Sequence, residues 1–108
     1  MTEIRKEFRA AVMLIDAERD RQIILWGEEN HDQLVWLSIL TEEVGEYAQA
    51  INETIFDNGP AERQKGGYDN LLRELTHVAA VAVSAMECLM RGRGAVMENK
   101  ERETGYGR

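Results

Sequence analysis

The feature that most limits the fold of this chain is a segment in which acidic and apolar residues recur with helical period. Residues 41–53 read TEEVGEYAQAINE and contain the pattern Glu-Glu-x-x-Glu. An apolar stripe on one helical face consists of Leu37, Leu40, Val44, Tyr47, Ala48, Ile51 and Ile55. Glu43 and Glu46 are neighbours on the flank of this stripe, where they repel each other and resist burial. Either a cation binds between them or this flank is a solvated acidic surface.

A second segment offers a similar pair of side chains. Residues 71–90 read LLRELTHVAAVAVSAMECLM, and Glu74 and His77 flank the apolar stripe three positions apart. Helical bundles build metal sites from side chains that project inward from facing helices. We therefore expect Glu43, Glu46, Glu74 and His77 to be metal ligands. The carboxylates suit Mg²⁺, and the imidazole shifts the preference toward Mn²⁺. The alternative for His77 is a partly buried side chain with an ordinary hydrogen bond.

Length and composition predict a single all-α domain over residues 1–108. Hydrophobic residues make up 44% of the chain and charged residues 31%, and there is one proline. The spacing predicts long helices over residues 3–26 and 33–56. Gly27 is the expected end of the first helix, and Asp32 is the expected N-cap of the second.

The third long helix is expected to start after Asp69 as its N-cap and to end near Arg91. It is separated from the second by DNGPAERQKGGYD, residues 57–69, which contain the only proline and mark the clearest break in the chain. Residues 95–108 are expected to form a short fourth helix or a peripheral tail. The whole is predicted to be a helical bundle.

The third helix also indicates an oligomer. Residues 79–85 read AAVAVSA, so small apolar residues occupy almost the whole circumference of the helix. A helix that is apolar all round is buried on all sides, and so short a chain cannot cover it alone. We therefore expect another subunit to complete the bundle. Cys88 cannot form an internal disulfide and is expected to be a small buried hydrophobe.

Charge and hydropathy limit the partners. The net charge is −7, and binding to a nucleic-acid backbone requires a basic surface, so no nucleic-acid partner is expected. A small phosphate ligand bridged by a metal remains compatible with this charge. The apolar runs are too short and interrupted for a membrane span, and the N-terminus lacks the apolar core of a signal peptide. We expect a cytoplasmic protein.

Other polar and aromatic side chains are candidates for contacts with a substrate. Glu42 points away from the apolar stripe but could act on a water at the metal as general base; its alternative is a surface glutamate. Trp26 and His31 flank the loop before the second helix and could hold a nucleobase or sugar, whereas a lone tryptophan there could instead be core. Trp36 is expected to pack. The tail offers Asn99, Lys100 and Arg102 to phosphate oxygens, unless it is simply solvated.

The order WGEENHD, WLSILTEEVGEYAQAINE, LLRELTHVAAVAVSAMECL resembles the MazG-like nucleoside triphosphate pyrophosphohydrolases, and most closely their short, phage-type, single-domain members. The likeness covers about residues 22–89. It implies an all-α fold, a divalent metal, and hydrolysis of a nucleotide between the α- and β-phosphates to a nucleoside monophosphate and pyrophosphate. It also implies a homodimer or homotetramer.

The resemblance assigns roles to particular residues. The family's metal-binding glutamates match Glu43, Glu46 and Glu74, and Glu42 matches the glutamate proposed to activate water. His77 departs from the family, which has an aspartate there, so the site loses one negative charge. The resemblance thus implies a metal-dependent hydrolase of (d)NTPs, with nucleotide-pool housecleaning as its role. The alternatives are a non-catalytic nucleotide-binding or interaction protein on the same fold, and a helical adaptor with no small ligand.

Overall fold

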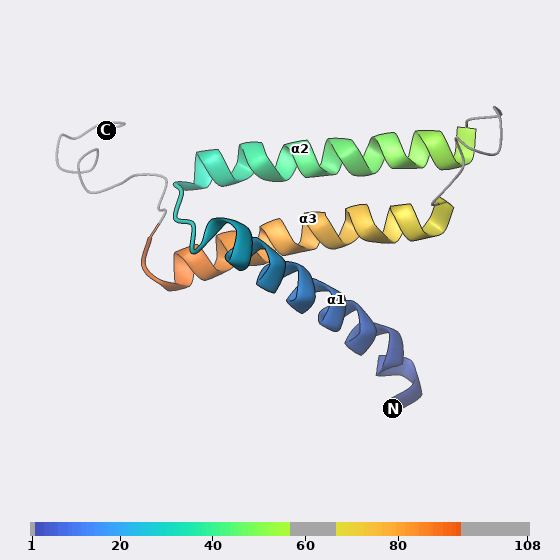
Figure 1. Cartoon of the computed structure of the whole chain (residues 1–108), viewed down its shortest axis with the longest axis horizontal. Helices are drawn as coiled ribbons and strands as arrows, with labels where there is room; N and C mark the ends of the chain where they lie inside the picture. Colours follow the sequence, from blue (N-terminus) through green and yellow to red (C-terminus); the bar gives the residue numbers. More distant parts are fainter. Residues whose placement is uncertain (1, 57–66, 94–108) are drawn as a thin grey trace.

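The computed structural model describes residues 2–56 and 67–93, which form an all-helical fold (Figure 1). The long helices are α1 (Thr2–Trp26), α2 (Gln33–Ile51) and α3 (Gly67–Met90). A short π-helical segment, η1 (Asn52–Phe56), continues α2. The predicted all-α class and the three long helices are therefore confirmed. The fourth helix or tail expected over residues 95–108 lies outside the described residues.

Helix α3 lies between the other two long helices. It runs antiparallel to α2 along most of its length, and α1 crosses it obliquely (Figure 1). The core where α2 and α3 meet contains Trp36, Val81 and Cys88, with Ile39, Leu40 and Ala85 packed around them. Trp36 is 4% exposed and Cys88 is fully buried, so both are packing residues as expected. Among the described residues, none of the helices combines the length and the apolar character of a membrane span.

The helix ends follow local chemistry. The Asp32 carboxylate accepts a hydrogen bond from the Val35 amide at 3.0 Å, which confirms the predicted N-cap of α2. Gly27 follows α1 with φ +72°, and its amide donates to the carbonyl of Ile23 at 2.8 Å. This left-handed conformation favours glycine and ends the helix as predicted.

One predicted boundary is wrong, and one helix changes its type within its predicted bounds. Helix α3 begins at Gly67, so Asp69 lies inside its first turn and is not the N-cap. A carboxylate in the first turn still interacts favourably with the positive end of the helix dipole. Regular α-helix α2 ends at Ile51, where the backbone changes to the π-helical η1, although the apolar spacing continues. Side-chain periodicity alone does not distinguish these two backbone hydrogen-bond patterns.

Helix α1 has an exposed half and a packed half. Every residue from Arg5 to Leu14 is exposed, and this half projects away from the pair formed by α2 and α3 (Figure 1). The packed half begins at Ile15. Arg19 then donates a hydrogen bond to Glu87 on α3 and another, at 2.9 Å, to Gln22. The contact between Arg19 and Glu87 holds the C-terminal half of α1 against α3.

The distribution of apolar surface bears on the expected oligomer. Within residues 79–85, Ala80, Val81 and Ser84 are buried, whereas the other four are half-buried. Large apolar side chains also remain exposed on all three helices, including Phe8, Met13, Ile24, Leu37, Val44, Leu72, Met86 and Leu89. An oligomer therefore stays a prediction, and the surface that it would cover is wider than the segment that first indicated it.

Candidate functional site

Two helices bring three of the predicted ligands together. Glu74 and His77 lie on one face of α3, and Glu43 faces them from α2. The Nδ1 atom of His77 is 3.7 Å from Oε1 of Glu74 and 3.9 Å from Oε1 of Glu43. One potential ligand atom from each residue lies within 4.8 Å of the other two. The i, i+3 spacing on α3 and the antiparallel packing of α2 produce this convergence.

The two glutamates each have an oxygen without a partner. Oε1 of Glu43 and Oε1 of Glu74 are buried and have no hydrogen-bond partner within residues 2–56 and 67–93. The side chains of Glu43 and Glu74 are only 24% and 13% exposed. A buried polar atom without a partner costs free energy, and an ionised one costs more. The donor set, two carboxylates and one imidazole, therefore fits a divalent cation such as Mg²⁺ or Mn²⁺.

The electrostatic strain of the cluster is visible at Glu43. Burial is the largest cause that raises the pKa of this carboxyl, and repulsion from Glu46, Glu74 and Glu18 raises it further. The neighbouring His77 acts in the opposite direction. Without a cation, ionisation of all the carboxyl groups at this site is therefore unfavourable.

A third carboxylate, which the sequence pattern did not predict, completes the surroundings of His77. Glu18 of α1 is 8% exposed, and its Oε2 lies 3.8 Å from Nε2 of His77. It accepts hydrogen bonds from Arg21 at 2.8 and 2.7 Å and from Gln22 at 3.0 Å. Arg21 is the largest cause that lowers the pKa of Glu18; Gln22 and His77 add to it, and burial opposes it.

The sequence contained no clear signal for Glu18. The apolar stripe of α1 passes through Phe8, Val12 and Ile15 and continues at Arg19, so Glu18 lies on the flank of that stripe. A carboxylate that is buried beside a core face must find partners inside the protein. Here the partners are Arg21 and Gln22, each within one turn of the same helix.

The two other glutamates of α2 take different positions. Glu46 is exposed and is not one of the three residues that can share an ion, although its charge acts on Glu43. Glu42 is exposed on the adjacent face, as its helical angle predicts. Neither position tests whether these residues contact a bound metal or its waters.

A pocket beside the cluster contains the predicted aromatic contact. It has a volume of about 250 Å³ and is lined by Trp26, Trp36, Glu43 and His77, together with Glu18, Arg21 and Ser84 among others. Trp26 is 58% exposed, and the Arg21 guanidinium carbon lies 5.9 Å from its ring centroid. An exposed indole thus borders the same hollow as Glu43 and His77.

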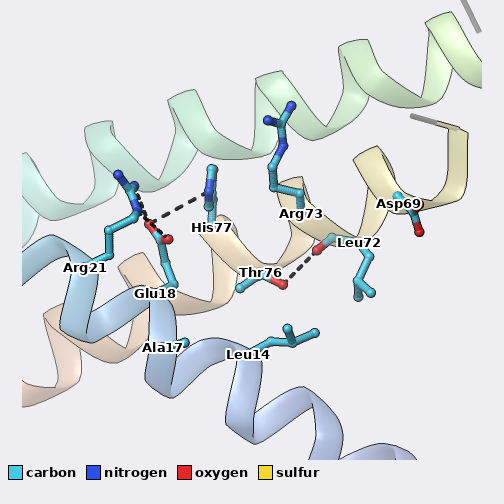
Figure 2. Close-up of a pocket in the computed structure, with 9 residues that line it drawn as sticks. All are labelled: Leu14, Ala17, Glu18, Arg21, Asp69, Leu72, Arg73, Thr76 and His77. Atoms are coloured by element: carbon cyan, nitrogen blue, oxygen red, sulfur yellow. Dashed lines mark hydrogen bonds and ion pairs between the residues drawn. The ribbon is translucent and has the colours of Figure 1, made fainter. Parts of the chain in front are cut away.

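A second pocket, of about 340 Å³, lies on the other side of Glu18 and His77, between α1 and α3 (Figure 2). Leu14, Ala17 and Leu72 form its apolar wall, and Glu18, Arg21 and His77 also line the first pocket. Figure 2 shows the carboxylate of Glu18 between the guanidinium of Arg21 and the imidazole of His77. These three side chains therefore separate the two pockets. Only the smaller pocket contains Glu43, so we associate the predicted ligand with that one.

His31, which was also predicted to contact a substrate, does not join the cluster. His31 packs edge-on against Trp36, with ring centroids 4.9 Å apart, and its backbone carbonyl accepts a hydrogen bond from the Cys88 thiol at 3.5 Å. Its side chain does not line either pocket described above. Three predicted phosphate contacts lie outside the described residues: Asn99, Lys100 and Arg102.

The chain was also compared with known proteins. No protein-family model, no curated protein and no solved structure matches it. Its function is therefore inferred from its residues and from the geometry of this site.

Proposed function

We propose that this chain is a metal-dependent nucleoside triphosphate pyrophosphohydrolase of the MazG-like type. It would hydrolyse (d)NTPs to (d)NMPs and pyrophosphate and so cleanse the cytoplasmic nucleotide pool. One observation carries the proposal: Glu43 and Glu74 direct buried oxygens, which have no hydrogen-bond partner in the described part of the chain, toward the position faced by Nδ1 of His77. A cation at this position would satisfy all three groups, and a triphosphate is a common partner of such a cation.

The site residues would divide the work as follows. Glu43, Glu74 and His77 hold Mg²⁺ or Mn²⁺, with Glu46 within reach as a further ligand or as a partner of metal-bound water. When bound, the cation neutralises charge on the phosphate oxygens and polarises the phosphoryl group. Glu42 accepts the proton of the attacking water, whose oxygen bonds to phosphorus as the bond to the oxygen bridging the α- and β-phosphates breaks.

The pocket beside the cluster is the proposed position of the nucleoside. Trp26 offers an exposed aromatic face for stacking on a base, and its pocket also contains Glu43 and His77. Both the base and the phosphates of a nucleotide would therefore have a partner in this one pocket. The exposed apolar side chains on all three helices favour a homodimer or homotetramer as the working form.

A second candidate function is a non-catalytic nucleotide-binding or interaction protein on the same fold. The observation that favours it is the position of His77 within 3.9 Å of three carboxylates, Glu18, Glu43 and Glu74. A protonated imidazole would partly neutralise these acids without any metal. The two candidates differ in whether the cluster binds a divalent cation at neutral pH.

A panel of ribo- and deoxyribonucleoside triphosphates, each with Mg²⁺ or Mn²⁺, tests the proposal by measuring pyrophosphate and monophosphate formation. We expect Glu43→Gln and Glu74→Gln to abolish turnover and to weaken Mn²⁺ binding in calorimetry. Glu53→Gln is the matched control, because Glu53 is an exposed glutamate that follows α2 and lies outside the cluster. Wild-type turnover in both cluster variants would show that the proposed metal site is wrong.

A further inference from the structure

The imidazole of His77 has carboxylates on both sides. Its Nδ1 faces Oε1 of Glu74 and Oε1 of Glu43, at 3.7 and 3.9 Å, whereas its Nε2 faces Oε2 of Glu18 at 3.8 Å. The two sides differ in their other partners. Oε1 of Glu43 and Oε1 of Glu74 lack hydrogen bonds within the described chain, whereas Glu18 already accepts three from Arg21 and Gln22.

We infer that Glu18 is a positioning residue, which keeps the proton of neutral His77 on Nε2 and so presents the Nδ1 lone pair to the cation between Glu43 and Glu74. The inference deepens the proposed function and rests on its metal site. It concerns which imidazole nitrogen is the ligand and which residue selects it.

The chemistry of imidazole explains how a neighbouring carboxylate selects the ligand atom. Neutral histidine has one N–H donor and one lone-pair acceptor, and only the nitrogen with the lone pair can bind a metal. Histidine ligands usually donate their other N–H to a carboxylate, a backbone carbonyl or water, which selects the tautomer and orients the ring. Glu18 supplies such a carboxylate on the side of the ring opposite Glu43 and Glu74.

Glu18 is well held for this role. Its side chain is 9% exposed, and hydrogen bonds from Arg21 and Gln22 on its own helix restrict where its oxygens can lie. The 3.8 Å separation from Nε2 is longer than a direct hydrogen bond. Contacts between an active-site group and the residue that orients it often shorten when the ligand binds, and one water can bridge this distance.

The two histidines of the chain make a direct test possible. Nitrogen NMR of the full-length protein, labelled with ¹⁵N-histidine and saturated with diamagnetic Mg²⁺, reports the tautomer of each ring. We expect His77 to carry its proton on Nε2. In Glu18→Ala the Nε2–H form should lose population at His77, whereas His31, which packs on Trp36, should keep its shifts. Glu18→Gln retains an acceptor oxygen and should preserve part of the preference.

Calorimetry with Mn²⁺ supplies the second readout. We expect Glu18→Ala to weaken Mn²⁺ binding by about 10- to 100-fold, the range for removal of a group that orients a metal ligand. The control is Glu87→Ala, which removes the ion pair with Arg19 between α1 and α3 without touching His77. It should leave both the tautomer and Mn²⁺ affinity unchanged, and circular dichroism would verify that each variant is folded.

The outcomes separate this inference from the proposed function. An Nδ1–H tautomer in the parent protein, or unchanged tautomer and affinity in Glu18→Ala, overturns the inference. Equal losses in Glu18→Ala and Glu87→Ala also overturn it, because the effect is then one of helix docking. A parent that binds Mn²⁺ through His77 as described but hydrolyses no nucleotide contradicts the proposed function alone. Failure to bind Mn²⁺ contradicts both.

Discussion

Glu43 of α2 and His77 of α3 face each other across the contact between the two helices, with Oε1 of the carboxylate 3.9 Å from Nδ1 of the imidazole. The carboxylates of Glu18, Glu46 and Glu74 repel that of Glu43 and make its ionisation less favourable. Glu74 is also near enough to share a cation with Glu43. Whether this pair stabilises or destabilises the contact between α2 and α3 therefore depends on whether a cation or a proton neutralises the carboxylates. The first two predictions follow from this relationship.

Glu43→Gln should stabilise the metal-free protein at neutral pH. The raised pKa of Glu43 means that the folded state holds this proton more tightly than the unfolded state. Its contribution to stability is fully present below the ordinary value of 4.5 and is lost as pH rises through the raised pKa. Replacement with a neutral amide should therefore raise the free energy of unfolding at pH 7 by about 0.5 kcal/mol, a typical value for charge pairs near a surface.

Urea unfolding in EDTA at a series of pH values would measure the effect of Glu43→Gln. The gain over the parent should shrink toward zero below pH 4.5, where Glu43 of the parent is itself protonated in both states. Glu53→Gln should show no such gain at any pH. A Glu43→Gln protein that is less stable than the parent at pH 7 without metal would contradict the expectation.

His77 variants should change the preference for metal. His77→Asp replaces an imidazole nitrogen with a carboxylate oxygen, which hard cations prefer, so it should lower the Mg²⁺ concentration needed for turnover. His77→Ala removes a ligand and should weaken Mn²⁺ binding by at least about tenfold. Titration of both metals against the parent and the two variants measures this. Identical behaviour of the parent and His77→Ala with both metals would leave His77 as a packing residue only.

The chain should not be a monomer in solution. Large apolar side chains stay exposed on all three helices, and the described core is small for a protein of this length. Where such side chains form a contiguous patch, they usually mark an interface between proteins. Sedimentation or light scattering at micromolar concentration should give a mass of two or four chains. A stable, folded species of 12.3 kDa would contradict the prediction.

Asp32→Ala should destabilise the protein through the N-terminus of α2. The carboxylate of Asp32 satisfies the Val35 amide at 3.0 Å, and alanine cannot replace this hydrogen bond. Loss of an N-cap costs about 1 kcal/mol. Thermal or urea unfolding would measure it, with Asp32→Asn as the control that retains a capping oxygen and should stay close to the parent.

Two glycines should respond to alanine in opposite directions. Gly45 lies within α2, and an added Cβ would meet no atom within 4 Å, so Gly45→Ala should stabilise the protein by about 0.5–1 kcal/mol. Gly27 has φ +72°, where an L side chain is strained, so Gly27→Ala should destabilise it by about 1 kcal/mol. Parallel urea unfolding of both variants checks the contrast. The same sign for both would contradict it.

The sequence predicts most of the described fold because its signals are local. Asp32 and Gly27 mark helix ends through the chemistry of one or two neighbouring residues, and apolar spacing identifies the long helices. The convergence of Glu43, Glu74 and His77 was also predictable, because i, i+3 spacing and antiparallel packing are enough to produce it. The switch from α- to π-helix at Asn52 was not, because it changes the backbone hydrogen bonds without changing the side-chain pattern.

Glu18 shows the limit of such reasoning. It lies beside the apolar stripe of α1 in a polar segment of the sequence, and its partner depends on where α1 crosses α3. The spacing of residues in the sequence does not determine where α1 crosses α3, because α2 lies between these two helices in the chain. The same limit applies to His31, whose place beside the loop gave no indication that its ring packs on Trp36 and leaves the neighbouring pocket to Trp26.

The projecting half of α1 has a thermodynamic consequence. Glu18 reaches His77 only while the packed half of α1 lies on α3, and residues 5–14 of the same helix are exposed to anything in solution. A molecule that grips those ten exposed residues and shifts the helix would also shift the carboxylate beside the imidazole. By linkage, if such a molecule changes the affinity of the site for a cation by some factor, the cation changes the affinity of that molecule for α1 by the same factor. The outer turns of α1 are thus a surface at which a bound molecule would change the affinity of the distant site for its cation.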